Sequence, residues 1–265
     1  MRELVLRALL GERLPEWRKA TIERVRQGQT DDAFRLTLGE RRAFCKVDTE
    51  PRSSSVNSRP EEASIQASVA KHGLSPNVLY SDEHCIVTEY VEAQVLTADD
   101  LASNATITRL GRQMKKLHGL PLTGRRFDAS AAAESYAATI DDRATSDRCI
   151  AAIDAIRADE ELVFSHNDMV VGNILLAESI FFIDWEYACD NSPLFDVATV
   201  VAHHALGIQA ARALLDARFG LVDQDLLANL MSYVRAYRAL YWLWLANRDP
   251  ADHRLGALAE LLDER

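Results

Sequence analysis

The polar residues between positions 163 and 196 offer the clearest chemistry in the sequence. They include the pattern H-x-D-x-x-x-x-N, formed by His166, Asp168 and Asn173, and a later apolar run that ends at Asp184. Phosphoryl transfer needs a carboxylate beside the attacking hydroxyl and oxygen ligands that hold Mg²⁺ against the phosphates. The spacing therefore predicts Asp168 as the catalytic base and Asn173 and Asp184 as metal ligands. We expect His166 to brace the loop by hydrogen bonds and not to act as a base.

Two other interpretations compete with this one. Asp and Asn are common in turns, so the same residues would also suit plain loop capping. A metal-dependent hydrolase would use His166 and Asp168 as metal ligands, but the sequence offers no third ligand at a metal-site spacing. The polar loop lies between two short apolar runs and is followed by Asp184, and this context favours phosphoryl transfer.

The patterns around this loop predict an α+β protein with two lobes. Short apolar runs in the first third indicate an antiparallel sheet with a tight hairpin at Gly39-Glu40, and most later runs have helical spacing. We expect a small N-terminal lobe (1–92), a hinge near 89–93 and a larger helical C-terminal lobe (93–265). The expected strands are 22–27, 33–38, 42–47, 77–80, 84–90, 162–165 and 180–183, and the expected helices are 1–10, 61–72, 107–118, 147–158, 194–206, 209–218 and 224–246.

The segment 163–176 resembles the Brenner loop of the aminoglycoside phosphotransferase and choline kinase superfamily. The run Ile183-Asp-Trp-Glu-Tyr-Ala188 is similar to the I-D-[FW]-E-Y-[AS] segment of the choline, ethanolamine and thiamine kinase branch, and Asn191 and Asp196 match that branch's N-x-x-x-x-D. The resemblance spans residues 24–247 and is most specific over 164–196. It implies a protein-kinase-like two-lobe fold and an ATP- and Mg²⁺-dependent kinase that phosphorylates the hydroxyl of a small cationic metabolite.

The resemblance also assigns residues that bind ATP. The turn 27–34 is similar to the family's phosphate-covering turn, so Gly28 and Thr30 are expected to contact the phosphates. A plain hairpin is the alternative for this turn. Glu89, Tyr90 and Val91 match the hinge that takes adenine through backbone hydrogen bonds, an assignment that depends on position and analogy.

Lys46 matches the family's phosphate-gripping lysine, which pairs with a Glu of the following helix. The run Arg59-Pro-Glu-Glu62 resembles the family's R-x-x-E, which favours Glu62 as the partner and leaves Glu61 as the rival. The alternative is that Lys46 is a solvated strand residue and that both acids simply favour the start of a helix.

A late helix predicts where the acceptor binds. It carries a group of aromatic residues, which are Tyr233, Tyr237, Tyr241, Trp242 and Trp244. The choline kinase branch uses such a helix to hold a quaternary ammonium, so the resemblance implies contacts from Tyr237, Tyr241 and Trp244. An ordinary core stripe is the alternative. Glu186 and Asp190 are expected to attract a cationic head group, and Asp196 to brace the catalytic loop, with solvated carboxylates as the alternative.

Composition narrows the class of protein further. The net charge is -10 and no basic run is present, so no nucleic-acid partner is expected. The negative field would attract a cationic small molecule, with simple solubility as the alternative explanation of the charge. No stretch approaches the length of a membrane span, so no membrane partner is expected. The four cysteines lack C-x-x-C spacing, which favours reduced buried thiols and a cytoplasmic location. The sequence leaves the oligomeric state open.

Several rival functions stay open at this point. An aminoglycoside kinase is the nearest, since it shares the loop and differs in the acceptor. A nucleotide-binding pseudokinase scaffold is a different class, but every expected catalytic position is filled. A protein kinase would carry H-R-D and D-F-G, which this chain lacks. Choline, ethanolamine and thiamine are not distinguished by the sequence, and neither are ATP and GTP.

Overall fold

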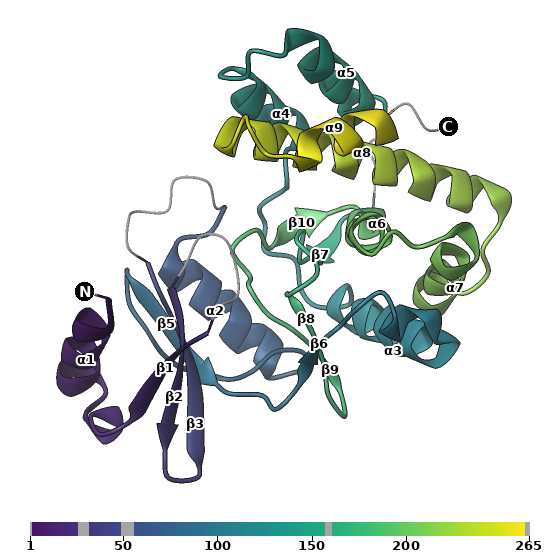
Figure 1. Cartoon of the computed structure of the whole chain (residues 1–265). Coiled ribbons are helices and arrows are strands. Elements are labelled where there is room, and N and C mark those ends of the chain that lie inside the picture. The colour runs from purple at the N-terminus through teal and green to yellow at the C-terminus, as the bar shows by residue number, and fades with distance from the viewer. Residues whose placement is uncertain (1, 26–31, 49–55, 157–160, 263–265) are drawn as a thin grey trace. The chain divides into compact units, whose positions relative to one another are not determined.

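The computed structural model describes residues 2–25, 32–48, 56–156 and 161–262, and Figure 1 shows its elements. The chain divides into two compact units. The first comprises Met1–Leu96 and Val171–Ala188, and the second comprises Thr97–Val170 and Cys189–Arg265. The first unit thus extends slightly beyond the expected lobe 1–92. It also includes the segment that carries Asn173 and Asp184.

The first unit contains a five-stranded antiparallel sheet in the order β1-β2-β3-β5-β4. The hairpin predicted at Gly39-Glu40 joins β2 to β3, and Gly39 has a φ of 60°, which glycine adopts without strain. The five strands lie close to the expected positions. They are β1 (Thr21–Val25), β2 (Asp32–Leu38), β3 (Arg41–Val47), β4 (Val78–Ser81) and β5 (Cys85–Glu89).

Two helices and a second small sheet complete this unit. The N-terminal helix α1 (Arg2–Arg13) and the short 3-10 helix η1 (Pro15–Trp17) pack onto the five-stranded sheet through Leu6, Leu10 and Trp17. Helix α2 (Arg59–Ala70) lies along β4 and β5. The small sheet has the order β6-β8-β9, from β6 (Gln94–Val95), β8 (Ile174–Leu176) and β9 (Ile180–Phe182).

The small sheet attaches the segment 171–188 to the rest of the first unit. The N–H of Leu96 donates to the Ile174 carbonyl at 2.9 Å, and the N–H of Phe182 donates to the Leu74 carbonyl at 2.8 Å. These main-chain bonds join parts of the chain that are 78 and 108 positions apart in the sequence.

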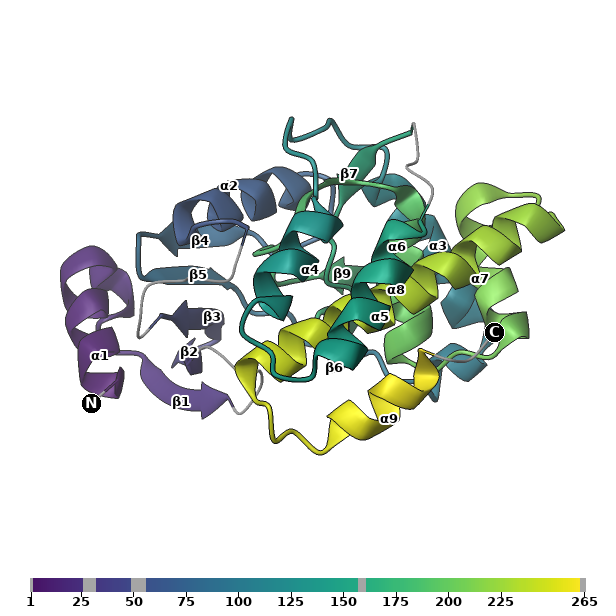
Figure 2. The ribbon, with the colours of Figure 1, turned by 90° about the horizontal axis from the view of Figure 1, so that it is seen from above.

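The second unit is mainly helical. Its long helix α8 packs against α4, α5, α6 and α9, as the view in Figure 2 shows, and α3 packs against α7. Two short strands, β7 (Val163–Ser165) and β10 (Cys189–Asn191), pair antiparallel. The helices are η2 (Asp100–Ala102), α3 (Asn104–Leu117), α4 (Ala129–Ala137), α5 (Arg143–Asp154), α6 (Pro193–His203), α7 (Ile208–Phe219), α8 (Gln224–Arg248) and α9 (Arg254–Leu261).

Most expected helices are confirmed, and the differences have local causes. Helix α5 begins earlier than predicted because the Asp142 carboxylate caps it by accepting the N–H of Thr145 at 3.1 Å. Helices α4 and α9 were not expected. Their apolar residues, mainly Ala in α4, give little contrast between faces, yet both pack beside α8.

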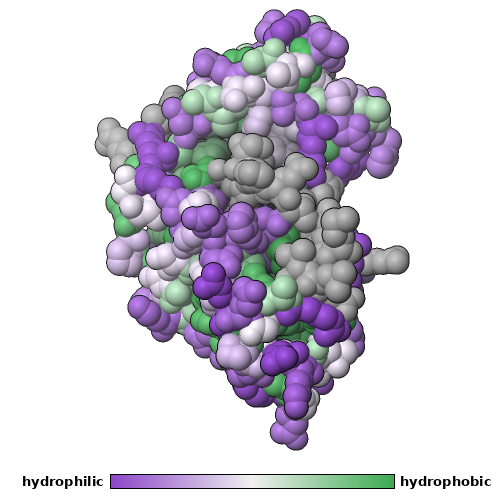
Figure 3. Space-filling model, turned by 90° about the vertical axis from the view of Figure 1, so that its left-hand side faces the viewer, coloured by the Kyte–Doolittle hydropathy of each residue, from purple (hydrophilic) through white to green (hydrophobic). Residues whose placement is uncertain are grey.

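The surface and the cysteines agree with the composition. Figure 3 shows hydrophilic residues over most of one face, with hydrophobic residues in small separate patches. Among the described residues, no helix is both long enough and apolar enough to cross a membrane. Cys45, Cys85, Cys149 and Cys189 are all free and buried, as predicted.

Candidate active site

The loop that carries Asp168 follows β7 in the second unit. Asn167 has a φ of 65°, a left-handed conformation that Asn tolerates better than most residues. The N–H of Asp168 donates to Nδ1 of His166 at 3.3 Å, and His166 is fully buried while Asp168 is partly exposed. This geometry agrees with a bracing role for His166, and the assignment of Asp168 as a base stays a prediction.

Asp196 holds the main chain of this loop. Its carboxylate accepts the N–H of His166 at 3.0 Å and the N–H of Asn167 at 2.8 Å, and it is fully buried in the first turn of α6. Burial raises the pKa of Asp196, but the hydrogen bond from His118, together with those from the loop N–H groups, holds it below its ordinary value. Asp196 is therefore an ionised brace, as the sequence led us to expect.

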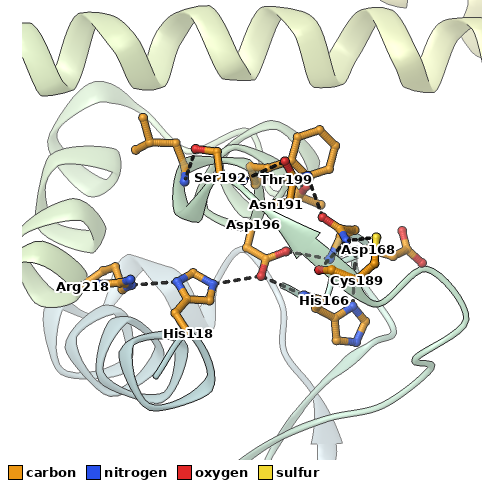
Figure 4. Close-up of polar contacts among 12 residues, drawn as sticks. His118, His166, Asp168, Cys189, Asn191, Ser192, Asp196, Thr199 and Arg218 are labelled. Carbon is orange, nitrogen blue, oxygen red and sulfur yellow. Dashed lines mark hydrogen bonds and ion pairs between the residues drawn. The ribbon is translucent and has the colours of Figure 1, made fainter. Parts of the chain in front are cut away.

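His118, which directly follows α3, links Asp196 of α6 to Arg218 of α7, as Figure 4 shows. Its Nε2 lies 2.9 Å from Asp196 Oδ2, and Arg218 Nε donates to its Nδ1 at 2.7 Å. Because Nδ1 accepts from Arg218, the ring proton must be on Nε2, which then donates to Asp196. Burial lowers the pKa of His118, so the ring is neutral and its contact with Asp196 is a hydrogen bond and not an ion pair.

A close approach of α3 and α7 allows Arg218 to reach His118. A Cβ placed on Gly111 of α3 would lie 2.5 Å from Cβ of Ala217, the neighbour of Arg218 on α7. Any side chain at residue 111 would therefore push the two helices apart. Sequence reasoning missed both His118 and Arg218, because pairs so far apart in the chain leave no local pattern.

Asn167 is also held by its side chain. Its Oδ1 accepts from Asn191 Nδ2 at 2.7 Å, and its Nδ2 donates to the Cys189 carbonyl at 3.3 Å. Asn191 Oδ1 in turn accepts the N–H of Ser192 at 2.8 Å. The motif residue Asn191 therefore links the catalytic loop to the start of α6.

The predicted metal ligands lie in the first unit. Asp184 has a φ of 71°, which is strained for a residue with a side chain. The N–H of Ile183 donates to the main-chain carbonyl of Asn173 at 3.0 Å, which places the two predicted ligands on adjoining backbone. Lys46 Nζ lies 2.7 Å from Asp184 Oδ2. This carboxylate therefore already faces a positive charge.

The residues present fit Mg²⁺ and not a protein-only metal cage. Asp184 and Asn173 offer hard oxygen donors, and Mg²⁺ usually takes few protein ligands and fills its shell with water and phosphate oxygens. Among the described residues, no group of three or more His, Cys, Asp or Glu side chains could hold a metal ion. The metal assignment stays a prediction.

The two candidate partners of Lys46 differ clearly. Glu61 is exposed, and its carboxylate accepts both the N–H and the hydroxyl of Ser58 in a capping box. Glu62 is 1% exposed and forms an ion pair with Arg59 at 2.8 Å. Glu62 is thus the buried member of the R-x-x-E pattern. Its predicted pairing with Lys46 stays a prediction.

The remaining nucleotide residues are only partly described. Gly28 and Thr30 lie outside the described residues. The N–H groups of Glu89 and Tyr90 donate to the carbonyls of Asn77 (2.9 Å) and Arg42 (3.4 Å). Neither N–H is therefore available to adenine without the loss of a sheet bond. The contacts predicted for Glu89, Tyr90 and Val91 would then come from the two carbonyls and from Val91.

The predicted aromatic residues form a row on α8. The rings of Tyr237 and Tyr241 are stacked with centroids 6.3 Å apart, and Tyr241 stacks on Trp244 at 5.9 Å. His203 of α6 lies against the row, 5.1 Å from Tyr241. Tyr237 is buried, whereas Tyr241 and Trp244 are partly exposed. The core interpretation therefore suits Tyr237 best, whereas Tyr241 and Trp244 each keep part of their surface exposed to solvent.

The two carboxylates expected near a cationic head group have different surroundings. Asp190 is 3% exposed, and its carboxylate accepts the N–H and hydroxyl of Thr123 and the N–H of Gly124. The expectation that Asp190 attracts a substrate is wrong, because its oxygens instead fix the turn before α4. Glu186 lies in the first unit, and its role stays a prediction.

A cavity of about 380 Å³ lies in the second unit and was not predicted. Buried Phe195 and Tyr233 line it, together with the exposed side chains of Arg126 and Asp128. Asn191 lines it as well, and Asn191 contacts Asn167, the neighbour of Asp168. One lining residue of the cavity therefore contacts the catalytic loop.

Known proteins resemble this chain in sequence and in fold. A family model described as phosphotransferase enzyme family matches residues 21–228. Protein LicA of Haemophilus influenzae is 50% identical over 52 residues, which are 19% of this chain and 20% of that protein. The chain spans only 15% to 45% of the length of the curated relatives that it matches.

Two solved structures share the fold. A choline/ethanolamine kinase family protein from Mesorhizobium loti has a TM-score of 0.78 and 23% identity, with coverage of 100% of this chain and 96% of that one. A LicA structure in complex with AMP has a TM-score of 0.74 and 14% identity, with coverage of 98% and 94%. These likenesses confirm the expected kinase-like α+β fold.

Proposed function

The chain belongs to the phosphotransferase enzyme family, and from this premise we propose that it transfers the γ-phosphoryl group of ATP to the hydroxyl of a small cationic alcohol. Choline, ethanolamine and thiamine are the acceptors that the motif favours. The solved structure of LicA contains AMP, which supports an adenine nucleotide as the donor. The family match also confirms the resemblance drawn from the sequence, at the level of the phosphotransferase family.

One observation supports a cationic acceptor more than any other. The aromatic row and the predicted base lie in the same unit, and the Asp168 carboxylate influences the pKa of two of the row's tyrosines. Burial raises the pKa of Tyr237 well above its ordinary value and that of Tyr241 less, and the Asp168 carboxylate contributes to both shifts. Stacked ring faces attract an ammonium, at about 0.5–2 kcal/mol per ring. A cation on the row would thus bring its hydroxyl toward Asp168.

In the proposed reaction, Asp168 accepts the proton as the hydroxyl oxygen attacks the γ-phosphorus and ADP leaves. Lys46 would bind phosphate oxygens of the nucleotide. Asp184 and Asn173 would hold Mg²⁺, which neutralises charge on the phosphates when it is bound. Asp196 keeps the main chain of the catalytic loop in place, so the base does not need to be ordered during the reaction.

A coupled assay of ADP release over a set of acceptors tests this proposal. The set contains choline, ethanolamine, thiamine, homoserine, simple sugars and aminoglycosides, each with ATP and with or without Mg²⁺. We expect turnover with a cationic alcohol, and no turnover without Mg²⁺. ADP release with none of these acceptors would contradict the proposal.

Two ring substitutions test the aromatic row. Tyr241→Ala and Trp244→Ala should each raise the KM for the cationic acceptor by about threefold to thirtyfold, with little change in the KM for ATP. Trp242 is a matched control on the same helix, because its ring is buried and its Nε1 donates to the Leu255 carbonyl. Trp242→Phe should reduce stability without a selective effect on the acceptor.

A larger polyhydroxylated acceptor, such as an aminoglycoside, is the second candidate. The cavity beside Asn191 favours it, because its volume of about 380 Å³ lies in the range of pockets for ligands larger than choline. For such an acceptor, Tyr233→Ala in the cavity should raise the KM more than Tyr241→Ala does. The opposite order would favour the small cationic alcohol.

A further inference from the structure

The turn that carries Asp184 needs support on both sides. Its φ of 71° is left-handed, so the turn keeps its shape only if its surroundings hold it. On the N-terminal side, main-chain bonds tie Ile183 to Asn173 and Phe182 to Leu74. The support on the C-terminal side comes from a residue far away in the sequence.

That residue is Asn57, which is fully buried. Its Nδ2 donates to the carbonyls of Trp185 and Ala188, both at 2.9 Å, and its main-chain N–H donates to the carbonyl of Glu186 at 2.9 Å. An amide group has two protons, and here both are used on the same turn. Three carbonyls that follow Asp184 are therefore bound by one residue.

Asn57 is itself fixed in place. It directly precedes the capping box in which Ser58 donates to Glu61. The next residue, Arg59, is 1% exposed and forms ion pairs with Asp48 and Glu62. The main chain around Asn57 is thus anchored to Asp48, which directly follows β3, and to the first turn of α2.

We infer that Asn57 is a positioning residue for Asp184. Asn57 binds three main-chain carbonyls that follow Asp184 in the sequence. It thereby fixes the left-handed turn and hence the direction of the Asp184 carboxylate. This inference extends the proposed function, because it assumes that Asp184 binds the Mg²⁺ of the nucleotide complex. Partners that orient a metal ligand typically change metal affinity by about 10–100-fold when they are mutated.

The test uses an exchange of an amide for a carboxylate at two sites in the same unit. Asn57→Asp replaces the two donors by an oxygen that repels both carbonyls. Gln66→Glu makes the same change at a matched position, because Gln66 is 4% exposed and its Nε2 donates to the Pro76 carbonyl at 2.9 Å. Binding of ATP is measured at increasing Mg²⁺ concentration, together with thermal unfolding. Asp184→Ala shows the effect of a complete loss of the carboxylate.

We expect Asn57→Asp to raise the half-saturating Mg²⁺ concentration by about tenfold or more, with ATP binding in the absence of Mg²⁺ unchanged. Gln66→Glu should lower the Tm without this shift. Equal Mg²⁺ dependence in the two variants would overturn the role of Asn57. Where the acidic variants do not fold, Asn57→Ala and Gln66→Ala provide the same contrast. A wild-type protein whose ATP binding ignores Mg²⁺ would overturn the proposed function as well, so the two failures are distinguishable.

Discussion

The loop before Asp168 and the turn at Asp184 both contain a left-handed residue, since φ is 65° at Asn167 and 71° at Asp184. The loop offers its N–H groups to a buried carboxylate, Asp196. The turn offers its carbonyls to a neutral amide, that of Asn57. The same backbone requirement is therefore met by a charged brace in one unit and by a neutral brace in the other.

This difference has physical consequences. Hydrogen bonds to a charged group are stronger than neutral ones, and a buried charge must be fully paired to be tolerated. Asp196 meets that condition through the loop N–H groups and His118, so its removal should affect the whole network. The neutral brace holds main-chain carbonyls, which do not titrate, so these bonds should not change with pH.

The largest effect is expected where the charged brace serves chemistry. Asp168→Asn should lower turnover by at least about a hundredfold, because the amide cannot accept the proton of the acceptor. ATP affinity should be unchanged, since the loop bonds made by Asp196 do not involve the side chain of residue 168. Single-turnover kinetics with an active acceptor measure the first quantity and nucleotide titration the second. Wild-type turnover in this variant would remove Asp168 from the mechanism.

Removal of the charged brace should be the most destabilising change in the second unit. Asp196→Asn sets an NH₂ group against one of the N–H donors and leaves the others poorly paired. We expect a decrease of about 3 kcal/mol in the free energy of unfolding. Denaturant titration checks this value. A decrease below about 1 kcal/mol would show that the network contributes little.

Acid should weaken the second unit through its buried histidines. Burial, aided by His204 and Arg254, lowers the pKa of His203 to about 4, and burial also lowers the pKa of His118. As the pH falls below about 6.5, the unfolded chain takes up protons that the folded state refuses, so stability decreases until the folded pKa is reached.

For His203 this loss should be on the order of 2 kcal/mol between pH 6.5 and 4. His203→Phe keeps a ring against Tyr241 and should flatten the decline. Unfolding curves at pH 7 and pH 4.5 for both proteins measure the difference. Parallel curves would assign the acid sensitivity to other groups.

The smallest effect is expected at Ser75, which supports the Asp184 turn beside Asn57 through neutral hydrogen bonds. Ser75 Oγ accepts from Trp185 Nε1 at 3.0 Å and donates to the Phe182 carbonyl at 2.8 Å, and it is buried. Ser75→Ala should lower the free energy of unfolding by about 1 kcal/mol. The decrease should be equal at pH 7 and pH 5, because neither partner titrates in that range. A decrease that varies with pH would contradict the distinction between the two braces.

Much of this arrangement was predictable from sequence because it is encoded locally. The loop from His166 to Asn173 and the run that begins at Ile183 combine a fixed spacing with apolar neighbours, and short apolar runs bounded by turn residues identified the five strands of the main sheet. Asp196 was predicted as a brace because it stands at a fixed distance from Asn191 in a recognisable motif. In each case the signal lies within about thirty residues of sequence.

The missed features all depend on contacts between distant segments. Asn57 is a single Asn in a loop, 128 positions from the turn that it holds. His118 and Arg218 meet only because α3 and α7 approach closely at Gly111. Asp190 was misjudged for the same reason, since the turn at Thr123 that uses its carboxylate lies 67 positions earlier. Sequence patterns do not encode such pairings.

The first unit is built from two separate segments of the chain, and this affects the order in which the protein can fold during translation. Strands β8 and β9 belong to a unit that otherwise ends at Leu96. During translation, the carbonyl of Leu74, the side chain of Ser75 and the amide of Asn57 therefore emerge from the ribosome long before their partners. The N-terminal part of the nascent chain cannot complete its structure until residue 188 has been synthesised. A fragment cut after Leu96 would lack those partners however long it is left to fold.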